Sequence, residues 1–285
     1  MVLFYYLLLI VSAIVPVVLL CYYIYRKDVN REPFRLLRKL FVLGFSGVFP
    51  VLFVELFLGR FFPNEGVNSS IILFINIFIS VALVEEGYKW IIVRFVGFND
   101  REFDEIYDIV VYSVFVSLGF ACIENIFYVL SGGFSSAIMR ALLSIPGHMC
   151  FAVIMGYFLA KSKVSLVNNN KKLMIKNSIY SLFFASLIHT IYDFILIYSA
   201  DKSSLLGIFI FLFFDIVMVV SCFITVHKIS KIQKNLSSSL KTGTILPSDN
   251  GHIMVNKELE IHFCPLCGRP ASNQNYCVNC GFKLR

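Results

Sequence analysis

Long apolar runs are the feature that most constrains how this chain can fold. Stretches close to the roughly 20 residues that an α-helix needs to cross a bilayer recur as far as residue 226. The sequence of 285 residues is 58% hydrophobic and holds 30 phenylalanines, far more apolar than a water-soluble domain requires. We therefore expect an all-α polytopic membrane protein with about seven transmembrane helices, at 2–25, 40–59, 71–93, 109–130, 138–160, 177–198 and 204–226.

The distribution of basic residues predicts how these helices are oriented. Lysine and arginine concentrate in every second connection, at 26–39, 94–108, 161–176 and 228–234. Only Arg60, Arg140 and Lys202 fall on the opposite side. Because basic loops remain cytoplasmic, the N-terminus should lie outside the cell and the C-terminus in the cytoplasm. The formal net charge of +7 then reflects orientation in the cell membrane, and no nucleic-acid partner is expected.

The character of the chain changes after the transmembrane domain at 1–226. Residues 227–262 are polar and rich in lysine, serine and asparagine, which predicts a cytoplasmic linker. Two CxxC pairs follow, each with a glycine directly after it, and this spacing predicts a structural zinc ribbon at 263–285. Disulfides are disfavoured in the reducing cytoplasm. The expected zinc ligands are Cys264, Cys267, Cys277 and Cys280. Interaction with a cytoplasmic protein partner, or regulation, is the expected role of the ribbon.

Charged and titratable residues lie well inside four consecutive expected spans. Each charged residue costs at least about 2.5–3.5 kcal/mol on insertion, so each needs a reason. The residues are Glu85, Glu86 and Lys89 in one span, then Glu124, then His148, and finally His189 with Asp193. Lipid cannot satisfy these groups, so we expect their helix faces to converge on one hydrated cavity. Asp215 stands alone in the last span and is expected to be structural or peripheral.

Helical spacing arranges these groups further. Lys89 lies within about 60° of both Glu85 and Glu86 around the helix axis, so it sits between the two carboxylates. Four carboxylates then face one lysine, and a low dielectric requires protonated acids, charged histidines or a bound divalent cation. Each outcome suits an enzyme that activates water. Each also suits a proton- or ion-coupled transporter, although no repeat symmetry between the two halves of the sequence is seen.

Four motifs carry a resemblance to a known family. EEGYK, FACIEN, a histidine followed eight residues later by glycine, and HTIYD occur in this order between Glu85 and Asp193. Their order and spacing resemble those of the PrsW family of intramembrane proteases, in the CPBP superfamily that includes the CAAX prenyl endopeptidases. The resemblance implies a membrane-embedded peptidase that hydrolyses a peptide bond in a membrane-anchored protein. A catalytically silent immunity or scaffold protein is the other alternative, and the intact EEGYK and HTIYD motifs speak against it.

The resemblance also implies roles for individual residues. One of the paired glutamates would polarise water, and the catalytic set would be Glu85, Glu86, Glu124, His148, His189 and Asp193. Supporting residues would be Lys89, Phe120, Asn125 and Gly156. The CAAX relatives carry histidine where this chain has Glu124, so His148 would supply that function. These residues leave open whether the reaction uses a divalent metal such as zinc or a metal-free glutamate mechanism. The HExxH motif of the zincins is absent. The candidate ligands of such a metal are Glu86, Glu124, His148 and His189.

Overall fold

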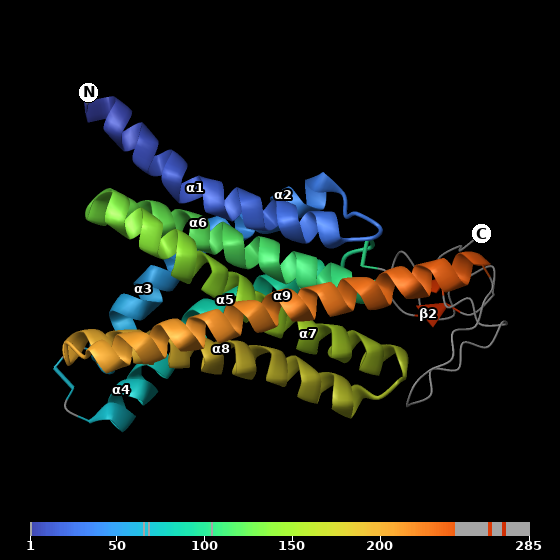
Figure 1. The fold of residues 1–285 in the computed structure, drawn as a ribbon. Helices are drawn as coiled ribbons and strands as arrows, with labels where there is room; N and C mark the ends of the chain where they lie inside the picture. Colours follow the sequence, from blue (N-terminus) through green and yellow to red (C-terminus); the bar gives the residue numbers. More distant parts are fainter. Residues whose placement is uncertain are drawn as a thin grey trace.

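The protein is a bundle of long helices (Figure 1). The computed structural model describes residues 2–64, 66–67, 69–103, 105–242, 262–263 and 270–271. The helices are α1 (Val2–Lys27), α2 (Phe34–Ser46), α3 (Val48–Leu58), α4 (Ser70–Ile77), α5 (Leu83–Ile92), α6 (Ile106–Met139), α7 (Ile145–Val167), α8 (Lys171–Asp201) and α9 (Leu205–Thr242). Short π-helices lie at Phe78–Ala82, Val93–Gly97 and Arg140–Ser144. Two-residue strands β1 (His262–Phe263) and β2 (Pro270–Ala271) pair antiparallel.

Six helical segments in the described part of the chain are long and apolar enough to cross a membrane. They are Val2–Lys27, Phe34–Leu58, Ser70–Gly97, Ile106–Leu166, Lys171–Asp201 and Leu205–Lys234. An all-helical, multi-pass membrane protein is therefore confirmed, whereas the expected count of seven is not. The difference lies in the fourth segment, whose 61 residues cover two of the expected spans.

The fourth segment folds back on itself at Gly133. This glycine has φ +68° and ψ −158°, a conformation that a residue without a side chain adopts at little cost. The helical segments on either side of Gly133 run antiparallel. Two hydrogen bonds show this, from Arg140 to Asn125 and from Ser117 to the backbone oxygen of His148. The turn therefore places the second half of the segment, including α7, directly against the first half of α6.

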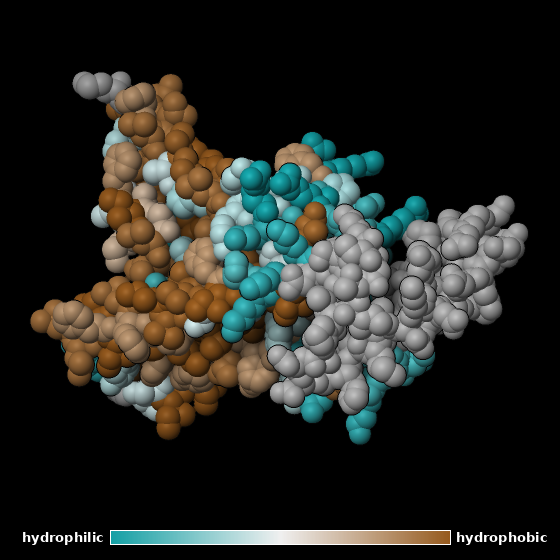
Figure 2. All heavy atoms as spheres, turned by 45° about the vertical axis from the view of Figure 1, so that its right-hand side comes forward, coloured by the Kyte–Doolittle hydropathy of each residue, from teal (hydrophilic) through white to brown (hydrophobic). Residues whose placement is uncertain are grey.

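Helix α6 forms the centre of the bundle. Its residues from Tyr107 to Ile123 are all buried, and it packs against α1, α2 and α7. A helix that is apolar all round must be buried in this way or face lipid, and the outer helices take the lipid-facing positions. Their outward side chains, such as Phe53 at 74% exposure, are hydrophobic. Figure 2 shows these apolar faces and a band of hydrophilic residues at one end of the body.

The segments with concentrated basic residues share one end of the bundle. The C-terminal end of α1, the start of α6, the α7–α8 turn and the far part of α9 all lie there, opposite the start of α1 (Figure 1). The sidedness expected from the charge pattern therefore matches the fold. Which end faces the cytoplasm stays a prediction.

The polar tail differs in part from its expectation. Helix α9 extends to Thr242, so the apolar run ends near residue 226 but the helix does not. The first part of the expected linker at 227–262 is therefore helical. Cys264, Cys267, Cys277 and Cys280 lie outside the described residues, and the zinc ribbon stays a prediction.

Gly156 lies where α7 crosses α6 most closely. A Cβ atom at this position would lie 2.8 Å from the Cα atom of Val110, inside van der Waals contact with backbone. The missing side chain at Gly156 therefore allows α6 to approach α7 closely. The residue supports the packing of α7, two turns away from His148, and does not reach the polar centre itself.

Substitution of Gly156 by leucine should weaken the α6–α7 contact. Backbone atoms cannot move aside as a flexible side chain can, so the free energy of unfolding should fall by about 1–3 kcal/mol or more. Thermal unfolding in detergent would measure the change. Gly87→Leu is the matched control, because a Cβ atom there meets nothing within 4 Å. Equal stability of the two variants would contradict the packing role.

Candidate active site

The paired glutamates and the lysine of α5 form a buried cluster. Lys89 Nζ lies 3.0 Å from Glu85 Oε2 and 2.7 Å from Glu86 Oε1, which is the arrangement expected from their helical spacing. Glu86 is fully buried, Lys89 is 1% exposed and Glu85 is 7% exposed. Helix α5 lies between two π-helices, whose wider turns change which face a helix presents and often occur at functional sites.

The third proton of the Lys89 ammonium reaches another helix. His148 of α7 places Nδ1 3.2 Å from Lys89 Nζ, and the ring of Phe120 lies 4.4 Å from the same nitrogen. An ammonium group can only donate, so Nδ1 must accept and the proton of a neutral His148 ring lies on Nε2. Phe120 supports the buried cation through its ring face, as a cation–π contact.

The opposite nitrogen of His148 binds Glu124 of α6. The distance between His148 Nε2 and Glu124 Oε2 is 2.9 Å, so the tautomer set by Lys89 donates to this carboxylate. The other oxygen of Glu124 forms an ion pair at 3.0 Å with Arg140 Nη2. Glu124, His148 and Lys89 therefore form one connected chain across α6, α7 and α5.

Arg140 is a basic residue of the polar centre that none of the four motifs contains. Its side chain is only 14% exposed and points back to Glu124. Its Nε also donates to Asn125 Oδ1 at 3.0 Å, and its guanidinium lies 4.1 Å above the ring of Tyr128. The position of Arg140 inside an expected span, 138–160, was the available indication that it has a buried partner.

Asn125 anchors the polar centre to the rest of the bundle. Its amide Nδ2 donates at 2.8 Å to the backbone oxygen of Ala13 in α1, while its Oδ1 accepts from Arg140. The side chain is completely buried. Asn125 therefore holds Arg140 and α1 in place and does not itself face the paired glutamates.

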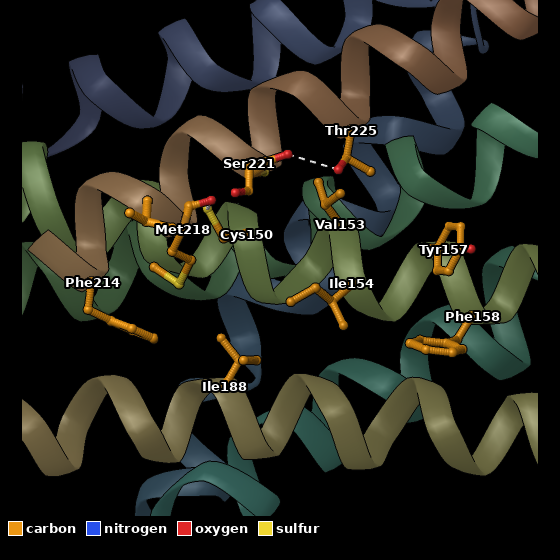
Figure 3. Close-up of a pocket in the computed structure, with 12 residues that line it drawn as sticks. Cys150, Val153, Ile154, Tyr157, Phe158, Ile188, Phe214, Met218, Ser221 and Thr225 are labelled. Atoms are coloured by element: carbon orange, nitrogen blue, oxygen red, sulfur yellow. Dashed lines mark hydrogen bonds between the residues drawn. The ribbon is translucent and has the colours of Figure 1, made fainter.

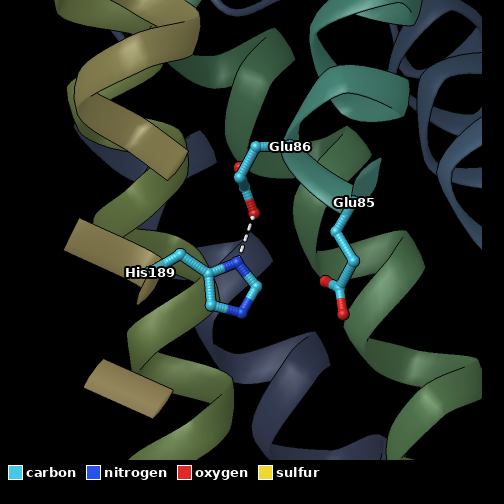
Figure 4. A group of neighbouring side chains, drawn as sticks. All are labelled: Glu85, Glu86 and His189. Carbon is cyan, nitrogen blue, oxygen red and sulfur yellow. Dashed lines mark hydrogen bonds and ion pairs between the residues drawn. The ribbon is translucent and has the colours of Figure 1, made fainter. Parts of the chain in front are cut away.

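His189 of α8 joins the cluster from the other side. Its Nδ1 lies 3.2 Å from Glu86 Oε1 and its Nε2 lies 3.3 Å from Asp193 Oδ2. Both ring nitrogens thus face carboxylates, and a doubly protonated ring would donate to both. Phe151 stacks on the ring with a centroid distance of 4.6 Å and fixes its plane. Figure 4 shows Glu85 and Glu86 reaching from α5 toward this histidine.

The residues expected to converge do converge. His148 and His189 lie with ring centroids 5.8 Å apart, and both contact groups of the α5 cluster. Asp215 of α9, by contrast, is buried and forms no ion pair with the described residues. The expected separation of Asp215 from the polar centre is consistent with this placement. Glu55 of α3 was not anticipated at all, although it is also an acid in an apolar run.

Two overlapping groups of side chains fit a divalent metal ion. Glu85, Glu86 and His189 form one group, and Glu85, Glu124 and His148 form the other. The ligand atoms of each lie within 4.8 Å of one another, and their oxygen and nitrogen donors are of the types that zinc accepts. Glu86 Oε2 is buried and accepts no hydrogen bond from the described residues. The first group therefore has one carboxylate oxygen that is available to bind a metal ion. Both nitrogens of the histidine already have partners in each group, His189 in the first and His148 in the second.

A separate apolar cavity of about 490 Å³ lies between α7, α8 and α9 (Figure 3). Cys150, Ile188 and Met218 contribute side chains from these three helices. Cys150 and Ile188 are close in sequence to His148 and His189, but the lining contains no acid, histidine or basic residue. The cavity therefore has no chemistry of its own.

Comparison with known proteins identifies the relatives of this chain. The sequence model described as PrsW family intramembrane metalloprotease matches residues 32–222, which include the whole polar centre. Protease PrsW of Oceanobacillus iheyensis and of Bacillus subtilis are each 38% identical to it, over 65% of this chain and 81% of their own length. Protease PrsW of Geobacillus kaustophilus is 37% identical over 70% of this chain and 85% of its own. No solved structure matches the chain.

Removal of the central ammonium should destabilise the bundle severely. Lys89→Met keeps much of the side-chain volume but leaves two buried carboxylates without their cation, which costs about 3–5 kcal/mol. The double variant Lys89→Met with Glu86→Gln should recover part of this loss, because it removes one of the two unpaired charges. Chemical unfolding of both variants in detergent micelles would measure the difference. A double variant no more stable than Lys89→Met would contradict the pairing.

Proposed function

Since the chain belongs to the PrsW family of intramembrane metalloproteases and is an integral, multi-pass membrane protease, we propose that its polar centre carries the reaction. The observation behind this proposal is the connection of six titratable groups on four helices through one lysine. The proposed catalytic set is Glu85, Glu86, Glu124, His148, His189 and Asp193. The substrate is a membrane-anchored protein. Motif order also supports placement in the CPBP superfamily.

Glu85 is the proposed base. It uses one carboxylate oxygen for Lys89 and is slightly exposed, whereas Glu86 is fully buried and shares Oε1 between Lys89 and His189. A base needs access to the water whose proton it takes as oxygen attacks the scissile carbonyl carbon. The ammonium of Lys89 lies 3.0 Å from Glu85 Oε2 and holds this carboxylate in place. Glu86 then positions His189.

His189 is the proposed donor to the oxyanion. Asp193 faces Nε2 and Phe151 fixes the plane of the ring, so the imidazole is oriented before the substrate enters. The Nδ1–H that faces Glu86 Oε1 in the resting protein would donate to the oxyanion in place of Glu86. A preoriented donor stabilises the negative charge that develops on the carbonyl oxygen. Glu124 and His148, connected to Lys89, complete the wall of the site on the α6 and α7 side.

A divalent ion would be held by Glu85, Glu86 and His189, because in this group Glu86 Oε2 is buried and accepts no hydrogen bond from the described residues. When bound, such an ion polarises a carbonyl and makes its bound water more acidic. The buried, apolar surroundings of these residues exclude bulk water, which strengthens every charge interaction in the centre.

The proposed topology has seven crossings, with the N-terminus outside and the C-terminus cytoplasmic. The antiparallel halves of the fourth segment, on either side of Gly133, would each cross once. An odd number of crossings agrees with the opposite ends at which α1 begins and α9 finishes (Figure 1). Basic segments at the α9 end favour the cytoplasm for that end.

The cysteine tail is proposed to be a structural zinc ribbon with a cytoplasmic protein partner. Support comes from the antiparallel pairing of His262–Phe263 with Pro270–Ala271, which stand on either side of the first CxxC in the sequence. The tail lies outside the region that the PrsW family model matches, so the ribbon is not part of the shared catalytic domain.

The glutamate roles lead to a mutational prediction. Glu85→Gln should lower cleavage of a co-expressed, tagged single-span substrate by at least about 100-fold, because the amide cannot accept the proton. Glu86→Gln should lower it less, by about 10-fold, through the loss of His189 orientation. Asp215→Asn is the control and should cleave nearly as well as the parent. Blotting for the substrate fragment provides the measurement, and full cleavage by both glutamine variants would rule out the proposed base.

The tail leads to a second prediction. Purified protein should hold one zinc ion with four sulfur ligands at about 2.3 Å, which X-ray absorption would detect. The variant Cys264→Ser with Cys277→Ser should lose this ion. Deletion of 263–285 should leave the thermal unfolding of the helical core unchanged. Loss of the helical fold on deletion would mean that the tail belongs to the core.

A further inference from the structure

Glu55 of α3 is an acid of the polar centre that none of the four motifs contains. It lies in the apolar run FVELFL, where a carboxylate is costly to insert. Its neighbours Phe53 and Leu56 are 74% and 66% exposed and face outward from the bundle. Glu55 is partly buried, and its Oε1 atom is buried completely.

The packing of α3 directs Glu55 toward the site. Val51, one turn earlier on the same face, is buried against Phe120 and Ile123 of α6. Glu124 follows Phe120 by one turn and contacts His148. Glu55 accordingly lies within electrostatic range of Glu85, Glu124, His189 and Lys89.

Glu55 differs from the other acids of the centre in its lack of partners. Glu85, Glu86, Glu124 and Asp193 each form an ion pair with Lys89, Arg140 or a histidine. Within the described part of the chain, Glu55 forms no ion pair, and its Oε1 accepts no hydrogen bond. A buried acceptor without a donor is unfavourable. A donor from outside the chain would remove this cost.

We propose that Glu55 binds the substrate, accepting a hydrogen bond from a main-chain N–H of the segment that is cleaved. This assignment rests on the proposed protease function. A helical substrate satisfies its own backbone groups, and its scissile carbonyl becomes reachable only when the helix unwinds. The freed N–H groups then need acceptors, and a carboxylate gives the stronger, charge-assisted bond. Glu55 provides this acceptor beside the base.

The stability of the resting protein tests the assignment without any substrate. Glu55→Leu removes the unpaired carboxylate, so its unfolding temperature in detergent should rise by about 2–4 °C. Leu56→Ala, on the lipid-facing side of α3, is the matched control and should not gain stability. A fall in the unfolding temperature of Glu55→Leu would give Glu55 a structural role and overturn the proposal, whether or not the parent protein cleaves anything.

Cleavage tests the binding role directly. The probes are fluorescein-labelled casein in detergent and a tagged single-span membrane protein. Glu55→Leu should lower kcat/KM by at least about 10-fold, as expected for a lost hydrogen bond to a charged group. Glu55→Gln should stay within about 3-fold of the parent, because its amide oxygen still accepts. Leu56→Ala should cleave normally.

The outcomes separate this proposal from the proposed function. If the parent cleaves neither probe, the protease assignment of the polar centre fails, and the thermal shift decides the role of Glu55. If the parent cleaves but Glu55→Leu is equally active, Glu55 does not contact the substrate. If Glu55→Gln is as inactive as Glu55→Leu, a neutral acceptor is insufficient and the hydrogen-bond role is overturned.

Discussion

The buried ammonium of Lys89 holds the polar centre together. Its donors reach Glu85, Glu86 and the ring of His148, and the face of Phe120 covers it. Burying an ammonium group without partners would cost several kcal/mol. The helices can therefore pack around Lys89 only because acceptors surround it. The contact also decides chemistry, because it sets the tautomer of His148 and so directs a donor toward Glu124. Side chains of α5, α6 and α7 thus all contact this one cation, and Glu86 also contacts His189 of α8.

The charge balance of the centre is a second constraint. Four carboxylates appeared to face one lysine, but the structure adds Arg140 to the cations and Glu55 to the acids. The excess of acid therefore remains, even when His189 is counted as a cation. Low dielectric does not tolerate such an excess without protons, a metal ion or a polar substrate. Two carboxylate oxygens of the centre, Glu86 Oε2 and Glu55 Oε1, are buried and accept no hydrogen bond from the described residues. A proton, a metal ion or a substrate donor is needed most at these two atoms.

The apolar scaffold makes this arrangement tolerable. Helix α6 is buried on all sides from Tyr107 to Ile123, and the reversal at Gly133 brings α7 back against it, so that Glu124 and His148 meet. Gly156 lets the two helices approach closely enough to hold this contact. Such packing supplies the stability that a site with unpaired acids lacks, and it leaves the lipid-facing helices free to be hydrophobic on their outer faces.

The amino-acid sequence alone determined the membrane class, the approximate helices and most members of the polar centre. It could do so because apolar length and intramembrane charge are local properties, and because spacing within one helix fixes which side chains share a face, as for Glu85, Glu86 and Lys89. The sequence could not decide which residues from different helices meet. The pairing of Arg140 with Glu124 depends on the turn at Gly133, which brings the two residues together, and Glu55 had no partner at helical spacing. The two ring nitrogens of His148 were likewise equivalent in the sequence. Only the tertiary structure distinguished them, because contacts between helices depend on where the chain reverses and how closely its helices pack.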